Sequence, residues 1–282
     1  MNSKRSLREK AGRFRELHHA DRLLLLPNAW DVPSARVFED AGFPAVATSS
    51  AAIAVSHGYP DGEQIPKHEL FPVVRRIADS LAVPLSADIE SGYGPTLEEL
   101  TDTVRRVVDA GAIGVNIEDV ADFAAHRLYS IEEQVERIAT VRTAASFLGV
   151  PLVVNARTDA DRLAPGDKTA RLEEAIRRAL AYKAAGADCL YPIGLTDRTA
   201  IRRFVRAVDH PVNVMARKGT PPVRELAEIG VRRLSLGPGP MYASIALLKR
   251  IGRELREAGT YRALTKDAIG FDELNALGRP RR

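Results

Sequence analysis

The sequence predicts an α/β fold, a (β/α)8 barrel that forms a single domain over residues 1–282. Three observations lead to this prediction. Eight short apolar runs alternate with stretches of helical periodicity, several helices end in a glycine that precedes the next run, and no Gly/Ser-rich linker divides the chain. Runs that are apolar on both faces are typical of parallel strands covered by helices. Eight strand–helix units in a chain of this length favour a closed barrel over an open sheet.

The predicted strands follow one another from the N-terminus. They are Leu23–Pro27, Ala45–Thr48, Pro84–Asp88, Ala112–Ile117, Pro151–Asn155, Asp188–Tyr191, Pro211–Met215 and Arg232–Leu236. Pro84, Pro151 and Pro211 each begin a strand, where a missing amide hydrogen is tolerated. The predicted helices lie between and after the strands. They are Pro33–Ala41, Lys67–Leu81, Thr96–Ala110, Ile131–Ala145, Ala170–Ala185, Thr199–Val208, Val223–Ile229 and Met241–Ala258.

Further helical segments flank the barrel, which we expect over about residues 22–258. A short basic amphipathic helix is predicted at Ser6–His18, and a C-terminal helical extension covers about residues 259–282, including Lys266–Leu277. A helix that follows a complete barrel has no sheet left to cover. We therefore expect the extension to pack on another subunit.

Composition excludes several classes of protein. A hydrophobic fraction of 45% with 28% charged residues is ordinary for a globular chain and argues against disorder. The longest aliphatic stretch near the N-terminus, Leu23–Leu26, is too short for a membrane span or a signal-peptide core. A single cysteine excludes an internal disulfide framework and favours a cytoplasmic protein. The net charge of +4, concentrated near the termini without interleaved aromatic residues, indicates no nucleic-acid surface and suits small anionic substrates.

Acidic residues follow two neighbouring predicted strands, where a barrel places its reactive groups. Asp88 and Glu90 are two residues apart and share one face, and Glu118 follows the next strand. Three converging carboxylates repel one another unless a hard cation lies between them, so we predict a site for Mg²⁺ or Mn²⁺. Arg157, after the fifth strand, would bind a substrate carboxylate or phosphonate. The alternative, that the acids cap helices or pair with Arg157, stays open.

Two further segments are candidates for substrate binding. Ser49, Ser50 and Ala51 follow the second strand, and their backbone N–H groups could hold an anionic oxygen, although such residues also serve as helix N-caps. Asn213 lies on the seventh predicted strand, near the end where a barrel places its reactive groups, and is a further candidate for substrate binding. Cys189 lies within the sixth strand and is expected to be a small core residue.

An ordered set of motifs resembles the isocitrate lyase/phosphoenolpyruvate mutase superfamily over roughly residues 20–250, including its 2-methylisocitrate lyase-like and carboxyphosphonoenolpyruvate phosphonomutase-like members. The motifs are Pro27-Asn28-Ala29-Trp30-Asp31, Ala41-Gly42 with Thr48-Ser49-Ser50, His57-Gly58-Tyr59-Pro60-Asp61-Gly62, Asp88–Gly94, Asn116-Ile117-Glu118-Asp119 and Ala156-Arg157-Thr158-Asp159. The resemblance implies a barrel whose last helix swaps between subunits, a dimer of dimers, Mg²⁺, and a 2-oxo- or 2-hydroxy-carboxylate substrate.

The resemblance also implies roles for individual residues. Asp88, Glu90 and Glu118 match the acidic Mg²⁺ site, with some of the contacts running through water. Asp61 matches an acid that helps to order the site. The cradle for the substrate carboxylate corresponds to residues 49–51, and Arg157 matches the substrate-binding arginine.

The loop after the fourth strand departs from the family pattern. Lyases of this family carry a Lys-Lys-Cys-Gly-His loop there, whose cysteine protonates the carbanion, and the mutases carry a lysine and an asparagine. Here Val120–Tyr129 contains neither cysteine nor lysine. His126, Arg127 or Tyr129 could supply the proton after loop closure, and we select His126 as the candidate. The alternative is a surface loop without a catalytic part.

These residues favour carbon–carbon bond cleavage next to a carboxylate, with Mg²⁺ and Arg157 neutralising the enolate. We expect Arg157→Ala and Asp88→Ala to abolish turnover and to leave the fold intact. Three alternatives remain: phosphorus transfer between carbon and oxygen as in the mutases, a metal-dependent dicarboxylate binder that has lost activity, and an unrelated phosphate-binding barrel. Gly237-Pro238-Gly239-Pro240 only weakly suggests the last, because its prolines lack N–H donors.

Overall fold

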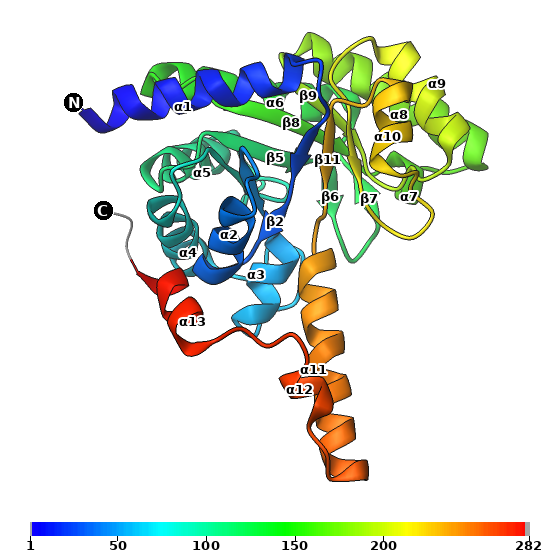
Figure 1. The fold of residues 1–282 in the computed structure, drawn as a ribbon. Helices are drawn as coiled ribbons and strands as arrows, with labels where there is room; N and C mark the ends of the chain where they lie inside the picture. Colours follow the sequence, from blue (N-terminus) through cyan, green and yellow to red (C-terminus); the bar gives the residue numbers. More distant parts are fainter. Residues whose placement is uncertain (1, 280–282) are drawn as a thin grey trace.

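The structure is a computed structural model that describes residues 2–279 (Figure 1). Its strands form two parallel sheets that close on each other as a barrel. One has the order β2 (Asn28–Ala29), β3 (Val46–Thr48), β4 (Leu85–Asp88), β5 (Gly114–Glu118), β8 (Val153–Thr158), β9 (Cys189–Pro192). The other has the order β1 (Leu24–Leu26), β11 (Arg233–Ser235), β10 (Asn213–Met215).

The two sheets join at both edges. Pro27 alone separates β1 from β2, so these two short strands form one stave of the barrel. At the other edge a parallel bridge between Leu190 and Val212 links β9 to the segment that enters β10. The predicted barrel and its eight strands are therefore confirmed, with boundaries that shift by one to three residues.

Helices cover the outside of the barrel between successive strands (Figure 1). They are α2 (Val32–Asp40), α4 (Lys67–Ser80), α5 (Leu97–Asp109), α6 (Ile131–Leu148), α8 (Lys168–Ala184), α9 (Arg198–Val208) and α10 (Val223–Ile229). Each corresponds to a predicted helix. Local signals explain where several begin: Asp31, Thr96 and Ser130 form capping boxes, in which the cap side chain accepts from the backbone three residues later.

Three short elements were not predicted, and all of them lie past the ends of strands. They are α3 (Ser50–Ser56), α7 (Ala160–Leu163) and the antiparallel hairpin of β6 (Val120–Asp122) with β7 (Arg127–Leu128). Each is too short to show a hydrophobic period, and therefore carries no periodic signal that predicts it.

Helix α1 (Asn2–His19) lies across the end of the barrel where the strands begin (Figure 1). Phe14 and His18 are fully buried there, with their rings edge to face and 4.7 Å apart. A Cβ atom on Gly114, at the start of β5, would lie only 2.8 Å from the Phe14 ring, so the close approach of α1 requires glycine at this position. The N-terminal end of the barrel is thus closed by α1.

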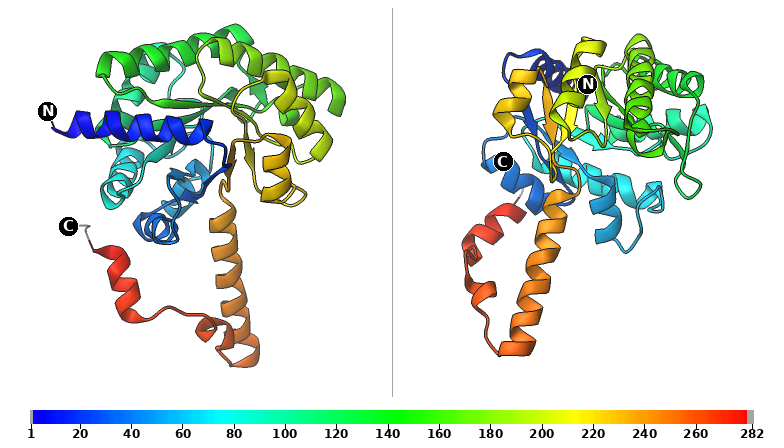
Figure 2. Two further views of the ribbon diagram at one scale, coloured as in Figure 1. Left: turned by 45° about the horizontal axis from the view of Figure 1, so that its top comes forward. Right: turned by 90° about the vertical axis from the view of Figure 1, so that its right-hand side faces the viewer.

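The C-terminal segment leaves the barrel. Helix α11 (Gly239–Ala258) projects away from it, and α12 (Arg262–Thr265) and α13 (Phe271–Gly278) lead the chain back toward α2 (Figures 1 and 2). The predicted continuous helix at Lys266–Leu277 is wrong. Asp267 adopts a left-handed φ of 59°, and the helix begins only after Gly270, because these positions interrupt helical hydrogen bonding.

Residues 280–282 of the predicted extension, with their basic tail, lie outside the described part of the chain. Within residues 2–279, no helix is both long enough and apolar enough to cross a membrane.

Candidate active site

A cavity of about 230 Å³ opens at the C-terminal ends of the strands. Every stave of the barrel contributes to its wall. The lining residues include Asn28, Ser49, Ser50, Ala51, Asp61, Ser86, Asp88, Asn116, Phe123, Asn155, Arg157, Arg162, Tyr191, Asn213, Arg217, Arg233 and Ser235. Most of these side chains are polar or charged. The cavity therefore suits a small polar ligand rather than an apolar one.

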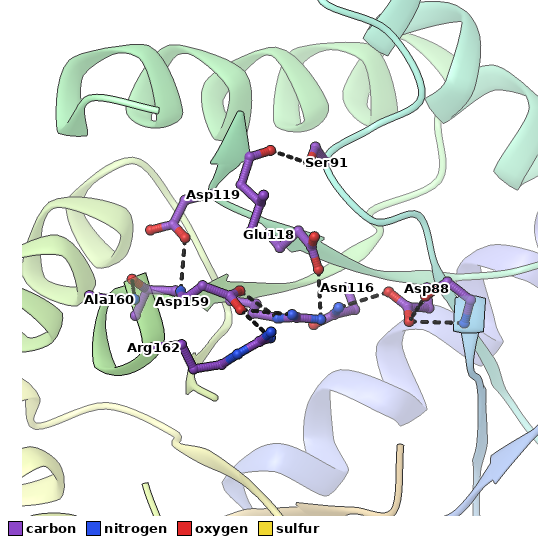
Figure 3. Close-up of polar contacts among 12 residues, drawn as sticks. Asp88, Ser91, Asn116, Glu118, Asp119, Asp159, Ala160 and Arg162 are labelled. Carbon is purple, nitrogen blue, oxygen red and sulfur yellow. Dashed lines mark hydrogen bonds and ion pairs between the residues drawn. The ribbon is translucent and has the colours of Figure 1, made fainter. Parts of the chain in front are cut away.

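The Asp88 carboxylate is fixed by hydrogen bonds on both of its oxygens (Figure 3). Its Oδ2 accepts from the Ser50 N–H at 3.1 Å and from the Ser50 hydroxyl at 2.8 Å, while its Oδ1 accepts from Asn116 Nδ2 at 2.9 Å. Asn155 Nδ2 donates in turn to Asn116 Oδ1 at 2.7 Å. This chain of bonds across β4, β5 and β8 holds Asp88 in one orientation at the cavity wall.

The predicted cradle at residues 49–51 has a more structural role than expected. All three residues line the cavity, but the Ser50 N–H already donates to Asp88. The Ser49 hydroxyl accepts from Ala52 N at 3.4 Å and caps α3. The N-cap alternative is thus confirmed for Ser49, whereas binding of a substrate carboxylate to this segment stays a prediction.

Arg157 is held by two carboxylates. Its Nη1 lies 2.6 Å from Glu118 Oε2, and its Nε and Nη2 donate to the two oxygens of Asp159 at 2.7 and 2.9 Å. A guanidinium has five N–H donors, and these contacts use three of them. Burial alone would lower the pKa of Arg157, but Asp159 and Glu118 raise it well above its usual value. Arg157 therefore stays charged, with donors left for a ligand, and it is also the structural partner of Glu118.

Asp159 is itself positioned by a buried network behind the cavity. Its backbone N–H donates to Asp119 Oδ1 at 2.9 Å (Figure 3), and Asp119 Oδ2 accepts from Tyr182 Oη at 2.8 Å and from Arg178 Nη1 at 3.2 Å. Asp119 and Tyr182 are fully buried. This network was not recognised from the sequence, because its members directly follow β5 and β8 or lie on α8, and they meet only in the folded chain.

The predicted acidic residues influence one another electrostatically but do not form a ready-made cage. Burial and the charges of Asp61 and Asp88 raise the pKa of Glu90 to about 8. Burial raises the pKa of Glu118 well above its usual value, with Arg157 opposing and Asp159, Asp88 and Glu90 adding to the rise. Among residues 2–279, no three His, Cys, Asp or Glu side chains are arranged to hold a metal ion.

The predicted acids do not surround a common point because Glu90 and Glu118 already have other partners. Glu90 accepts from the Glu63 N–H at 2.6 Å and from Tyr93 Oη at 3.0 Å, and Glu118 pairs with Arg157. Of the four acids predicted from the sequence, Asp61 and Asp88 line the cavity, and Glu90 and Glu118 do not. The cavity still fits a hard cation, because its acceptors are carboxylate and amide oxygens and Mg²⁺ is usually held by one or two carboxylates with water. Asp88 would hold the cation, and direct coordination by all three predicted acids stays a prediction.

Four buried polar atoms on the cavity wall have no hydrogen-bond partner among the residues that the structure describes. They are Ser86 Oγ, Asn155 Oδ1, Asn213 Oδ1 and Arg233 Nε. Buried polar groups are nearly always paired in folded proteins, so a group of unpaired ones around a cavity indicates a ligand or ordered water. Asn213, predicted to bind substrate, is thus placed in the cavity wall, where its Nδ2 donates to Ser235 Oγ at 3.1 Å.

The structure places His126 away from the cavity. It is exposed in the turn of the β6–β7 hairpin, with a left-handed φ of 52°. Phe123 from the same hairpin lines the cavity instead and lies against Gly62, where an added Cβ would be 3.5 Å from the Phe123 ring. Cys189 is fully buried, and burial raises the pKa of its thiol to about 12, which confirms it as a core residue.

The fold and the site together define a class of barrel protein with a polar cavity built around an arginine and a fixed carboxylate. The family model of phosphoenolpyruvate phosphomutase matches residues 14–256, and the chain belongs to this family. The resemblance found in the sequence to the isocitrate lyase/phosphoenolpyruvate mutase superfamily is confirmed.

Known relatives align with most of this chain. It is 33% identical to 2-methylisocitrate lyase of Bacillus subtilis (strain 168) over 218 residues, which are 75% of this chain and 69% of that protein. It is 30% identical to oxaloacetate decarboxylase of Rhodopseudomonas palustris (strain TIE-1) over 270 residues, covering 92% and 89% of the two chains.

Solved structures agree with this assignment. Oxaloacetate acetylhydrolase in complex with oxalate has a TM-score of 0.84 at 25% identity, covering 95% of this chain and 93% of that one. Phosphoenolpyruvate phosphomutase from Streptomyces platensis subsp. rosaceus has a TM-score of 0.83 at 26% identity, covering 95% and 94%. The superfamily contains lyases and mutases, so the chain has the fold and family of enzymes.

Proposed function

We propose that this protein is a divalent-metal-dependent lyase that cleaves a carbon–carbon bond next to the carboxylate of a small 2-oxo or 2-hydroxy acid. The main support for the proposal is that one polar cavity is lined by both a carboxylate and an arginine. The carboxylate of Asp88 is fixed by hydrogen bonds, and the guanidinium of Arg157 keeps N–H donors for a ligand. Relatives that act on such acids, including 2-methylisocitrate lyase and oxaloacetate decarboxylase, support it.

The chain's own residues would bind and orient the acid. The remaining N–H groups of Arg157 would donate to the oxygens of the substrate carboxylate, because the ion pairs with Glu118 and Asp159 fix the plane of the guanidinium. When bound at Asp88, Mg²⁺ or Mn²⁺ supplies positive charge beside the enolate that bond cleavage leaves. Arg157 adds a second fixed positive charge on the same cavity, which stabilises that enolate further.

Protonation of the enolate needs a donor that the resting geometry does not provide. His126 remains our candidate, and the β6–β7 hairpin would have to move to bring its imidazole into the cavity. His126→Gln should then slow turnover while leaving the binding of oxalate unchanged. Full activity of this variant would assign the proton to another group.

The experiment that tests the function is a screen of the purified protein with Mg²⁺ against 2-methylisocitrate, 2,3-dimethylmalate, oxaloacetate and phosphonopyruvate, with products identified by NMR. We expect cleavage of at least one of the first three acids and its loss in Asp88→Asn. Rearrangement of phosphonopyruvate alone would favour the mutase alternative, which the matching family model supports. Binding of oxalate by calorimetry without turnover of any acid would favour the inactive dicarboxylate binder.

We further propose that the protein is a homo-oligomer in which α11 packs on a second copy. Leu248 and Leu255 on this helix are 61% and 57% exposed, and only Met241 among its residues is buried. An apolar helix that leaves its own barrel is stabilised when another surface covers it. Analytical ultracentrifugation should show the oligomer dissociating in Leu248→Glu/Leu255→Glu, and a monomeric wild type would contradict the proposal.

A further inference from the structure

Arg233 is a buried cation deep in the barrel, two residues before the strand end that carries Ser235. It begins β11, pairs in register with Leu24 and Asn213, and is 2% exposed. Its side chain nevertheless lines the same cavity as Asp88 and Arg157. The cavity thus has an arginine near each end, Arg157 at the mouth and Arg233 toward the floor closed by α1.

No counter-ion accompanies this arginine in the part of the chain that the structure describes. Arg233 takes part in no ion pair among residues 2–279, and its Nε has no hydrogen-bond partner. Within the described part of the chain, its side chain makes one polar contact, from Nη1 to His18 Nε2 at 3.5 Å. Placing a cation in a protein interior without an opposite charge is strongly unfavourable.

His18 does not supply the missing charge. Its Nδ1 lies 2.8 Å from the carbonyl oxygen of Phe14 and donates to it, so in the neutral ring Nε2 is left as an acceptor for Arg233. Burial and the nearby Arg233 lower the pKa of His18 to about 3, so the ring is neutral at physiological pH. The floor of the cavity therefore carries a positive charge that makes no ion pair within residues 2–279, and the Asp88 carboxylate on the same cavity acts on it without contacting it.

The unpaired acceptors nearby indicate what kind of group would complete this floor. Asn213 Oδ1 belongs to the strand next to Arg233 and, like Asn155 Oδ1 and Ser86 Oγ, is buried without a partner on the same cavity. An anionic oxygen would pair with the guanidinium of Arg233. A hydroxyl next to that oxygen would donate to one of the amide oxygens.

We propose that Arg233 is a second anion-binding residue, which receives the far carboxylate of a diacid whose first carboxylate lies at Arg157. The inference rests on the proposed function and adds to it a preference for 2-hydroxy or 2-oxo acids with a second negative group. Arg157, whose charge is neutralised within the protein, orients the near end. Arg233, whose charge is not, selects the far end.

The test compares two acids that differ in one group. Malate and 2-hydroxybutanoate share the 2-hydroxy-carboxylate, and the far carboxylate of the first is a methyl group in the second. With Mg²⁺ present, calorimetry should show that the wild type binds malate at least about tenfold more tightly, as a charged hydrogen bond provides. Arg233→Met should remove this preference and leave the affinity for 2-hydroxybutanoate unchanged. Arg233→Lys, which keeps the charge, should retain part of it.

Arg217→Met is the matched control, because Arg217 is an exposed arginine on the rim of the same cavity. It should leave the preference for malate intact. A second readout is thermal: without ligand, Arg233→Met should melt at a higher temperature than the wild type, since it removes an unpaired buried charge. This readout also shows that the variant folds.

The outcomes separate this inference from the proposed function. Equal binding of both acids by the wild type, or a preference that persists in Arg233→Met, overturns the inference and leaves the function standing. A preference that disappears equally in Arg217→Met places the far carboxylate at the rim and also overturns it. Failure of the wild type to bind either acid overturns the proposed function and the role of Arg233 with it.

Discussion

The mouth and the floor of the barrel handle buried positive charge in opposite ways. At the mouth, Arg157 makes ion pairs with Glu118 and Asp159, and Asp159 is in turn held by Arg162 at 2.7 Å. At the floor, Arg233 lies beside a neutral histidine and has no acidic partner within residues 2–279. The mouth is thus complete before a ligand arrives, whereas the floor is completed only by a ligand.

The two regions therefore have different roles in binding a ligand. Charges that are paired within the protein fix geometry, because each partner limits the rotamers of the other. A charge that is left unpaired stabilises whichever opposite charge enters, at the expense of the folded state without ligand.

Removal of the mouth arginine should have the largest effect. Arg157→Ala leaves Glu118 and Asp159 buried without their main partner, so we expect the free energy of unfolding to fall by about 3–5 kcal/mol. The expectation from the sequence that this variant keeps its fold intact is revised accordingly. Urea unfolding measures the loss, and Arg157→Lys should lose less stability because it retains the charge. A loss below about 1 kcal/mol in Arg157→Ala would contradict the paired mouth.

Asp88→Asn should separate chemistry from folding. The amide keeps the shape of the side chain, and its oxygen can still accept both hydrogen bonds from Ser50. Its NH2 group would face the Asn116 Nδ2 donor, so we expect the melting temperature to fall modestly while the fold is retained. Loss of the charge that would hold the cation should lower kcat by about a hundredfold or more. Steady-state kinetics on the substrate found in the screen would measure this fall in kcat. Activity near that of the wild type would remove Asp88 from the proposed mechanism.

Acid should destabilise the floor through His18. Its pKa is about 3 in the folded protein and near 6.5 when unfolded, so the unfolded state binds the additional proton as the pH falls below 6.5. Between pH 7 and pH 5 the free energy of unfolding should therefore decrease by about 2 kcal/mol from this group. His18→Asn, which retains a donor for the Phe14 carbonyl, should show a flatter profile despite lower stability overall. If the free energy of unfolding depends on pH equally in the wild type and in His18→Asn, His18 does not cause the loss of stability in acid.

Tyr182→Phe should have the smallest effect. It removes one hydrogen bond to Asp119 while Arg178 and the Asp159 N–H still satisfy that carboxylate. We expect a loss of about 1 kcal/mol in the free energy of unfolding and an unchanged preference between malate and 2-hydroxybutanoate. Urea unfolding and calorimetry check the two parts. A change in that preference would connect the network behind the mouth to the floor.

The barrel could be predicted from the sequence because its signals are local. Each strand is a short apolar run, and glycines that end helices, such as Gly111 and Gly186, adopt the left-handed conformation, with φ of 88° and 100°. The local pattern was misleading at Lys266–Leu277, because Asp267 and Gly270 interrupt the helix there. It also missed the β6–β7 hairpin, whose strands are only three and two residues long.

The candidate site could be predicted only in part. Asp88, Arg157 and Asn213 were found because strand ends in a barrel converge, and all three line the cavity. What each residue contacts could not be read from the sequence, because pairs such as Asp119 with Tyr182 are far apart along the chain. Arg233 was not identified as a candidate at all. Its distinguishing property is a missing partner, which only the complete set of neighbours reveals.

The closure of one barrel end by α1 has a consequence for substrate entry and product release. Because Phe14 and His18 close the floor, the acid of the proposed cleavage and its two products would pass through the same opening at the strand ends. Whichever fragment forms nearer the floor must wait until the outer one has departed. Such a chamber enforces an order of exit, and the inner fragment should act as a competitive inhibitor of the incoming acid.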